Sequence, residues 1–353
     1  MGKKPPRQKK RRPDVNRFLV KQTETPLHVE HQFSGMRLDK FVADRMSWRS
    51  RTAVRRLIDD EKVLVEGVAR RASYRVKRGE TVLAPLPEQP WSKPEMIKDI
   101  SLDVIYEDDA IVVLNKQPGV VVHPVGGKLF NTILNALHLR YRRPHDPQHD
   151  IIPKLAHRID KDTSGVLVAT KTDEALRRLR IEFEKKTAQK EYLAIVEGEC
   201  SAELKRITLA IAKDKESKNH TKRMAVAPDE DIEEHEDLDT AETLVEIEER
   251  FKGFTLLRLL PKTGRTHQLR VHLSAVGHPI LCDRLYSKRA AITLKELDPE
   301  SASDEIVLNR QALHAHRLRV HHPTTGEPVE FVAPLPADMR RVVDILRPHS
   351  ATS

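Results

Sequence analysis

A proline-rich segment near residue 90 restricts the fold of this chain more than any other feature. Four prolines fall within "APLPEQPWSKPE", residues 84–95. Proline lacks a backbone N–H and fixes its own φ, so helix interiors and central strands exclude it. Such a stretch forms a stiff, extended linker. We therefore predict a linker at 84–99 that separates two independently folded parts.

The part before the linker is predicted to be a small α+β domain at 36–83. Apolar residues recur with helical spacing in two short segments, 37–46 and 50–60. Two strand-like segments follow, the second of them entered through a glycine turn. Residues 1–35 are predicted to be a basic arm and lead-in, since the first 17 residues carry eight Lys/Arg and three prolines and favour disorder.

The part after the linker, 100–345, alternates strand-like and helical segments. Strands are predicted at "AIVVLNK", "KEYLAIVEG" and "FTLLRLLP", and helices at "TDEALRRLRIEFEKK" and "RTHQLRVHLSAVG". Because strands outnumber helices, a mixed α+β sheet is favoured over a doubly wound one. Residues 229–242, with nine acids and no Lys or Arg, and residues 288–307 are predicted to be surface insertions.

The charge of the chain indicates a polyanionic partner. Lys and Arg number 62 against 53 Asp and Glu, which gives a net charge of +9. Residues 37–78 alone contribute +7, and the outer face of the second predicted helix offers Arg49, Arg51, Arg55 and Arg56. A solvated helix face is the plain alternative. The concentration of charge favours RNA or DNA binding.

The remaining composition points to a cytoplasmic protein. No apolar run approaches the ~20 residues that span a bilayer, so no membrane partner is expected. The N-terminus lacks the apolar stretch of a signal peptide. The two cysteines, Cys200 and Cys282, have no metal-type spacing and fit a reducing compartment.

No cofactor and no metal are expected. "GVVVHPVGGK" has the wrong glycine spacing for a phosphate-binding loop, and no G-x-G-x-x-G follows a strand. His267 and His272 are five residues apart, which is off-face on a helix. His314 and His316 could share a strand face, but nothing nearby completes a tetrahedral ligand set.

A small set of polar residues remains that could carry chemistry. Asp160 lies in "LAHRIDKDTSG", between an arginine and a polar turn. In the helix predicted at 265–277, His267 and Arg270 are three residues apart and project from the side opposite the apolar stripe. Each such residue alone is more often a turn, cap or surface residue. Taken together they predict a site made of Asp160, His157, Arg158, Tyr192, Arg265, His267 and Arg270.

Five blocks resemble the RluA/RluD-type pseudouridine synthases, in that family's order. They are "LNKQPGVVVHP", "HRIDKDTSGVLVATK", "KEYLAIVEG", "LPKTGRTHQLRVHLSAVGHPILCDRLY" and "LHAHRLRVHHPTTGE". Residues 36–83 resemble the alpha-L RNA-binding module first seen in a small-subunit ribosomal protein. Three positions depart from these patterns: Glu61 and Cys282 replace glycines, and Glu66 replaces an asparagine. Cys282 is expected to alter a turn and not the chemistry.

The resemblance implies an α+β catalytic domain with a mixed, largely antiparallel sheet, and an isomerase that needs no cofactor. It implies that Asp160 acts at the anomeric carbon of a uridine, and that Arg270 pairs with Asp160 and keeps it ionised. Tyr192 would stack on the flipped uracil, and Arg158 would fill the gap that the base leaves. His157, Arg265 and His267 are the other expected substrate contacts. RNA contacts through the module are expected from Arg37, Arg49, Ser50, Arg51, Arg55 and Arg56.

The expected partner is structured RNA, ribosomal RNA first, including RNA within pre-ribosomal particles, and the chain is expected to be a monomer. Transfer RNA is the alternative substrate. Two other classes stay open: a non-catalytic RNA-binding ribosome-assembly factor, and a nucleoside or DNA glycosylase, which would release free uracil.

Overall fold

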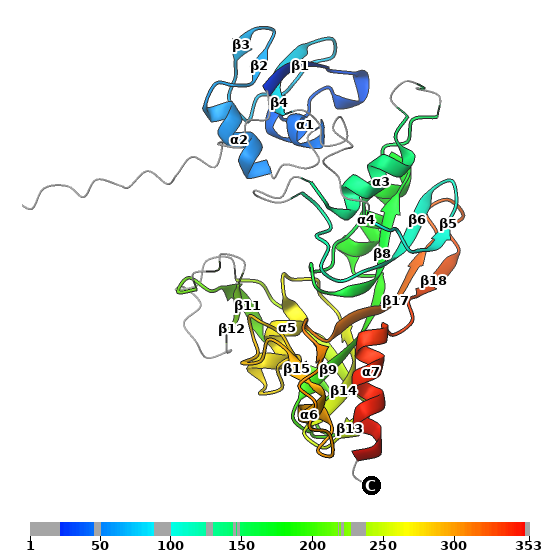
Figure 1. Cartoon of the computed structure of the whole chain (residues 1–353). Coiled ribbons are helices and arrows are strands. Elements are labelled where there is room, and N and C mark those ends of the chain that lie inside the picture. The colour runs from blue at the N-terminus through cyan, green and yellow to red at the C-terminus, as the bar shows by residue number, and fades with distance from the viewer. Residues whose placement is uncertain are drawn as a thin grey trace, which may run out of the picture. The chain divides into compact units, whose positions relative to one another are not determined.

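The computed structural model describes residues 22–45, 51–87, 100–124, 130–143, 146, 149–217, 219, 222–226 and 238–349. The chain divides into two compact units, one formed by Met1–Asp99 with His123–Asn135, the other by Ile100–Val122 with Ala136–Ser353 (Figure 1). Each unit has a hydrophobic core of its own. Among the described residues, no helix has the length and apolar character needed to cross a membrane.

The first unit packs two helices on a four-stranded sheet. The helices are α1 (Leu38–Arg45) and α2 (Arg51–Asp59), preceded by the short 3-10 helix η2 (His31–Phe33). The strands, in the sheet order β1-β4-β2-β3, are β1 (Gln22–His28), β4 (Thr81–Pro87), β2 (Leu64–Val65) and β3 (Val68–Ala69). The apolar stripes predicted for the helices form the core, where Leu38, Phe41, Val42 and Val54 are fully buried.

The sheet of this unit extends beyond the predicted domain, 36–83, at both ends. Strand β1 lies inside the predicted arm and lead-in, and it pairs with β4 from Gln22↔Pro87 to His28↔Thr81. Strand β4 in turn runs into the predicted linker. Its prolines are tolerated because β2 pairs with β4 only as far as Leu83. Beyond that point β4 has a single neighbour, the kind of position where a missing N–H costs little.

Both glutamates that replace Gly or Asn in the module have left-handed backbones. Their φ angles are 55° at Glu61 and 50° at Glu66, a region that Gly and Asn adopt more readily. Glu66 and Gly67 form the two-residue turn between β2 and β3, where both residues need a positive φ. The carboxylate of Glu66 accepts a hydrogen bond from the Thr81 amide, which gives this side chain a structural contact within the module.

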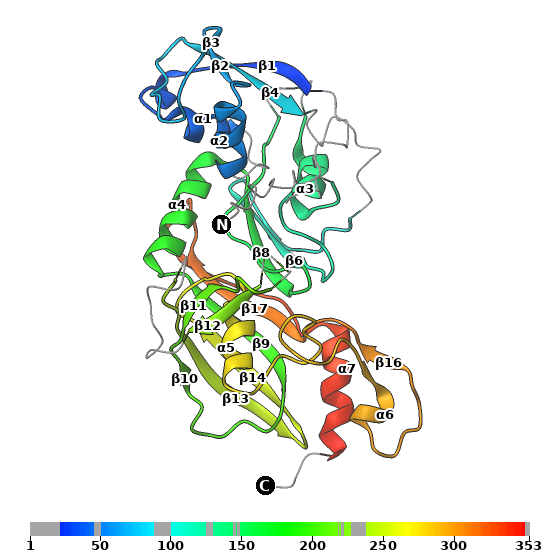
Figure 2. The same cartoon turned by 90° about the vertical axis from the view of Figure 1, so that its left-hand side faces the viewer.

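The second unit is built on a ten-stranded sheet with the strand order β10-β13-β14-β9-β17-β8-β6-β5, to which β18 adds beside β17 and β7 beside β8. The strands are β5 (Val104–Glu107), β6 (Ile111–Lys116), β7 (Lys154–Leu155), β8 (Ser164–Thr170), β9 (Gln189–Glu197), β10 (Arg206–Ile207), β13 (Thr243–Phe251), β14 (Phe254–Pro261), β17 (Leu313–His321) and β18 (Pro328–Val332). Every pairing is antiparallel except that of β17 with β8. The predicted mixed, largely antiparallel sheet is therefore confirmed, and Figure 2 shows its long strands β9, β14 and β13 side by side.

Two small hairpins accompany the main sheet. They are β11 (Ala210–Lys213) with β12 (Arg223–Val226), and β15 (Ile292–Thr293) with β16 (Ile306–Leu308). The prediction that 288–307 is a surface insertion is wrong, because Ile292, Leu297 and Val307 are buried in the main core. Most of the other predicted insertion, 229–237, lies outside the described residues.

The helices of the second unit flank the sheet. They are α3 (Ile133–Tyr141, which begins at the boundary between the units), α4 (Asp173–Lys185), α5 (Gln268–Ala275), α6 (Leu294–Leu297), α7 (Ala337–Leu346) and the 3-10 helix η6 (Arg347–His349). Thr172 caps α4: its Oγ1 accepts a hydrogen bond from the Ala175 amide at 3.1 Å. Helix α5 begins three residues later than the pattern suggested.

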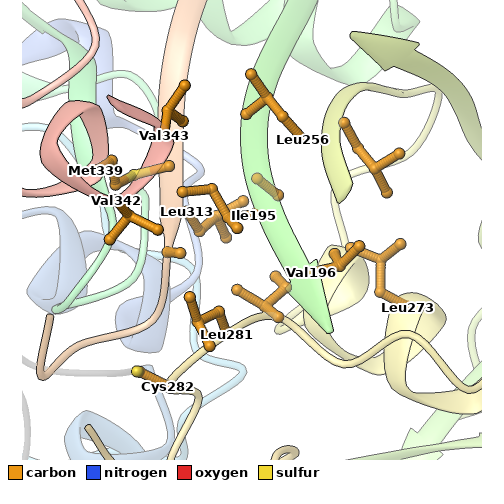
Figure 3. Close-up of a cluster of buried hydrophobic side chains, with 14 of the residues drawn as sticks. Ile195, Val196, Leu256, Leu273, Leu281, Cys282, Leu313, Met339, Val342 and Val343 are labelled. Carbon is orange, nitrogen blue, oxygen red and sulfur yellow. The ribbon is translucent and has the colours of Figure 1, made fainter. Parts of the chain in front are cut away.

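The main core joins helices α5 and α7 to the centre of the sheet. Ile195 and Val196 of β9 lie among Leu256, Leu273, Leu313 and Met339, all at most 8% exposed (Figure 3). Close packing of this kind leaves little freedom for rotation or translation of a helix. Helix α5 is therefore held in a fixed orientation against the sheet.

Candidate active site

A pocket of about 560 Å³ opens in the second unit, within the range that binds nucleotide-sized ligands. Its walls are the segment before β8, the end of α4, the start of β9, the loop before α5, and α5 itself. All seven site residues that the sequence predicted in this unit line it. They are His157, Arg158, Asp160, Tyr192, Arg265, His267 and Arg270.

Asp160 and Arg270 form an ion pair at the floor of this pocket. Arg270 Nη1 donates a hydrogen bond of 2.9 Å to Asp160 Oδ2. The side chain of Arg270 is 8% exposed and that of Asp160 is 21% exposed. The pair joins α5 to the turn that precedes β8, across 110 residues of chain. The pair places the positive charge of Arg270 directly beside the Asp160 carboxylate.

Asp283 is the site residue that sequence reasoning missed. It accepts two hydrogen bonds from Arg270, from Nε at 2.6 Å and from Nη2 at 2.7 Å, and its side chain is fully buried. Burial alone would lower the pKa of the Arg270 guanidinium, but the hydrogen bonds and charges of Asp283 and Asp160 outweigh burial and raise it. The bidentate partner of Arg270 is thus Asp283, while Asp160 receives the one remaining nitrogen. The available signal was the block "CDRLY", where this acid follows an unusual cysteine.

That cysteine occupies a turn, as predicted. Cys282 has φ = 59°, a left-handed conformation that explains why a glycine is usual at this position. Its thiol is buried in the core of Figure 3, and burial raises its pKa to about 12. The turn directs the following Asp283 toward Arg270.

Tyr192 lies on β9 with its ring partly buried against the main core. Strand β9 is held on both sides, since Tyr192 is opposite Leu259 of β14 and Ala315 of β17. Burial, and then the negative charge of Asp160, raise the pKa of the phenol. The hydroxyl therefore keeps its proton near neutral pH, and the ring offers the pocket a flat apolar face.

His267 reaches Asp160 by a different geometry from the predicted one. It is not a helical residue but the residue before α5, with φ = 59°. Its Nδ1 lies 2.9 Å from the Tyr286 hydroxyl, and its Nε2 lies 3.8 Å from Asp160 Oδ2. Burial lowers the pKa of His267 to about 4, although the charge of the nearby Asp160 acts in the opposite direction. A neutral imidazole therefore faces the carboxylate.

The other three pocket residues differ in how strongly neighbouring groups hold their side chains. His157 Nε2 accepts a hydrogen bond from the Val168 amide at 3.0 Å, so this ring also supports the wall of the pocket. Arg265 pairs with Asp239 at 2.8 Å. Arg158 is exposed at the rim.

The residues predicted to bind RNA through the first unit are described only in part. Arg37 donates to the buried Asp39 at 3.1 and 3.2 Å, and Arg55 lies 4.0 Å from the same carboxylate. Arg56 is exposed on α2. Arg51 begins α2, but its side chain, like Arg49 and Ser50 as a whole, lies outside the described residues.

Taken together, the pocket presents a carboxylate beside a guanidinium, a neutral imidazole and an aromatic face. A carboxylate in this setting can act as a nucleophile or base on a bound ring system. The aromatic face suits a planar, unstacked base.

Comparison with known proteins identifies the families that match the two parts of the chain. The family described as RNA pseudouridylate synthase matches residues 110–275, and the S4 domain matches residues 36–82. The chain is 37% identical to "Uncharacterized RNA pseudouridine synthase YlyB" of Bacillus subtilis, over 88% of this chain and 94% of that protein. It is 38% identical to "Ribosomal large subunit pseudouridine synthase D" of Vibrio vulnificus and 36% identical to the protein of that name from Escherichia coli, in both cases over 93% of this chain and 96% of the relative.

Among solved structures, the chain is similar in fold to "Human RNA Pseudouridylate Synthase Domain Containing 4". The TM-score is 0.54 at 24% identity, and the match covers 69% of this chain and 93% of the human one.

Proposed function

The chain belongs to the RNA pseudouridine synthases, and from that membership we propose that it isomerises uridines of large-subunit ribosomal RNA through Asp160. The observation that carries the role of Asp160 is its 2.9 Å contact with Arg270 in a pocket that also holds Tyr192. The contact holds the Asp160 carboxylate in the pocket, where we place the flipped uridine.

The reaction breaks the bond between N1 of uracil and C1′ of ribose and makes a bond from C5 to C1′. The C5 proton leaves, and N1 ends with a proton, so the product is an isomer of the substrate. Asp160 acts at the sugar, either as nucleophile at C1′ or as base for a glycal-type intermediate, much as glycosidases use a carboxylate. Arg270 balances the charge of Asp160 until the sugar carbon becomes electron-poor.

Tyr192 serves as the surface on which the uracil stacks while it is detached. Base–aromatic stacking is worth about 1–3 kcal/mol, enough to retain the uracil through its rotation. The raised pKa of the phenol argues against its use as a base. Arg158, exposed at the rim, is placed to fill the gap in the RNA that the flipped uridine leaves.

The S4 domain at the N-terminus is the second RNA contact. Arg55 and Arg56 are exposed on α2, and we propose that this face binds phosphates of structured RNA. Arg37 is tied to Asp39 and orients the start of α1 as well as contributing charge.

Ribosomal RNA is preferred over transfer RNA because relatives that match over 93% of the chain carry the name ribosomal large subunit pseudouridine synthase D. We further propose that the enzyme acts in the cytoplasm, on ribosomal RNA within pre-ribosomal particles. We propose that it acts as a monomer.

The test is to map pseudouridines in cells that lack the protein. We expect one or more positions in large-subunit ribosomal RNA to lose the modification, wild-type protein to restore it, and Asp160→Asn protein to fail. Losses confined to transfer RNA would overturn the proposed substrate. Abasic sites with free uracil would instead indicate a glycosylase.

A further inference from the structure

We propose that Lys190 binds a phosphodiester of the target nucleotide in the active site. Lys190 and Tyr192 are two residues apart on β9, and both line the pocket. Side chains with this spacing leave the same face of a strand about 7 Å apart. That separation lets one side chain hold the base and the other the backbone phosphate of one nucleotide. The inference deepens the activity above and rests on it.

Lys190 is a partly buried cation for which the described residues supply no carboxylate or carbonyl partner. Two other partly buried lysines of this unit are paired: Lys154 with Asp173 and Lys171 with Glu107, both at 2.6 Å. The still more deeply buried Lys116 donates to three backbone carbonyls at 2.8–3.0 Å. Lys190 has only the ring of Phe183 at 5.9 Å, and burial lowers the pKa of its ammonium group.

A partly buried ammonium group without an anionic partner destabilises the protein. Binding of an anion offsets that cost. The substrate provides one, because RNA carries a negative charge at every nucleotide. Lysine binds phosphate as a point charge and needs no particular plane of approach. A phosphodiester drawn to the ammonium would therefore supply the missing partner at the moment the uridine enters.

The loop opposite Lys190 leaves room for this contact. A Cβ built on Gly264 would lie 3.2 Å from Lys190 Nζ and would meet nothing else within 4 Å. Gly264 does not have a left-handed backbone, so its conformation does not require a glycine. We infer that a glycine is favoured here because it leaves space beside the Lys190 ammonium group. Lys262, exposed on the same lip of the pocket, adds a second positive charge along the path of the RNA backbone.

Lys190→Met tests the proposal, with Lys190→Arg as the conservative variant and Lys252→Met as the matched control. Lys252 is exposed in the turn between β13 and β14, at the end of β14 remote from the pocket. In the first measurement, each protein binds a ten-nucleotide single-stranded RNA over a range of salt concentrations. We expect Lys190→Met to reduce the slope of log K against log salt by about 0.7. Lys190→Arg and Lys252→Met should each keep the wild-type slope.

The second measurement is turnover on large-subunit ribosomal RNA from cells that lack the enzyme. For Lys190→Met we expect KM to rise roughly tenfold, with kcat within about twofold of wild type. The melting temperature should be unchanged or higher, because an unpaired buried charge has been removed. A lysine with a merely structural role would lower the melting temperature instead.

An unchanged salt slope for Lys190→Met would overturn the proposal. A fall in kcat with KM unchanged would also overturn it, since Lys190 would then act on the negative charge that uracil gains when the N1–C1′ bond breaks. Binding of the oligonucleotide requires no turnover. A wild-type enzyme that is inactive on ribosomal RNA would therefore count against the proposed substrate, and the salt slope would still decide the role of Lys190.

Discussion

One guanidinium between two carboxylates controls the geometry of the active site. Nε and Nη2 of Arg270 donate hydrogen bonds to the buried Asp283, and these two bonds fix the plane of the guanidinium. Its third nitrogen, Nη1, is then directed at Asp160. A lysine could not bridge the two acids in this way, because its ammonium lacks the planar fork of arginine.

Asp283→Asn should therefore damage the enzyme although Asp283 does not touch the substrate. The neutral amide cannot accept two charge-assisted hydrogen bonds, so Arg270 loses its fixed plane. We expect kcat to fall on the order of 10–100-fold, with KM within about threefold of wild type. Steady-state kinetics on the ribosomal RNA substrate would measure both constants.

The matched control is Asp150→Asn. Asp150 accepts the same bidentate arrangement from Arg142, at 2.8 and 2.9 Å, but does not line the pocket. It should leave kcat unchanged. Wild-type kcat in Asp283→Asn, or an equal loss in both variants, would show that Asp283 does not position Arg270.

At the scale of single elements, periodicity predicted those whose apolar residues face one core. The stripes of α1 and α2, the strand β9 and the helix α4 were all visible in the sequence because each depends on neighbouring residues. Strand β1 was not visible: "QTETPLH" has no apolar alternation, and its place is set by pairing with β4 more than fifty residues later.

The same reasoning explains which parts of the site could be predicted. Asp160, Tyr192 and Arg270 stood out through the matched blocks, and the fold brings them together. The contact of Asp283 with Arg270 depends on a left-handed turn at Cys282, and the pairing of Arg265 with Asp239 depends on how two loops meet. Neither local propensity nor spacing along the chain encodes such contacts.

The centre of the sheet also makes stability dependent on pH. His314 of β17 is fully buried: its Nε2 lies 3.1 Å from the Ala333 carbonyl and its Nδ1 lies 2.9 Å from the Ser164 hydroxyl. Burial lowers the pKa of His314 to about 4, from 6.5. As the pH falls below 6.5, the unfolded chain takes up this proton before the folded chain does. Stability is therefore lost between pH 6.5 and 4.

We predict that the free energy of unfolding decreases over this range, with a contribution from His314 of about 3 kcal/mol at most. Denaturant unfolding at a series of pH values measures it. The His314→Gln side chain cannot take up the proton. The slope of its unfolding free energy against pH should therefore correspond to about one proton fewer than in the wild type. Equal slopes in the two proteins would show that His314 is protonated in the folded state.

At the scale of the whole molecule, we propose that the first unit binds RNA and the second carries out the chemistry. Every residue that lines the pocket lies between Ala156 and Leu313, in the second unit. The S4 domain and the arm before it hold much of the positive charge. Because β4 extends to Pro87, a deletion that removes the whole S4 sheet must extend beyond residue 87.

Deletion of residues 1–99 should weaken binding of structured RNA by about tenfold or more and reduce its salt dependence, since each lost phosphate contact removes about 0.9 from the slope on duplex. At saturating RNA, kcat should stay within about fivefold of the full chain. Deletion of residues 1–21 alone, which spares β1, separates the arm from the domain. A collapse of kcat at saturation would mean that the first unit positions the uridine.

The role of Asp160 is tested most directly by the purified enzyme and its Asp160→Asn variant on a large-subunit ribosomal RNA transcript labelled with tritium at C5 of uracil. Pseudouridine formation releases this tritium, and we expect the reaction to proceed without an added cofactor. We predict that the wild-type enzyme releases tritium and forms pseudouridine, while Asp160→Asn binds the RNA normally and turns over at less than about 1% of the wild-type rate. Turnover of Asp160→Asn above about 10% of wild type would contradict the assignment of Asp160 as the catalytic residue.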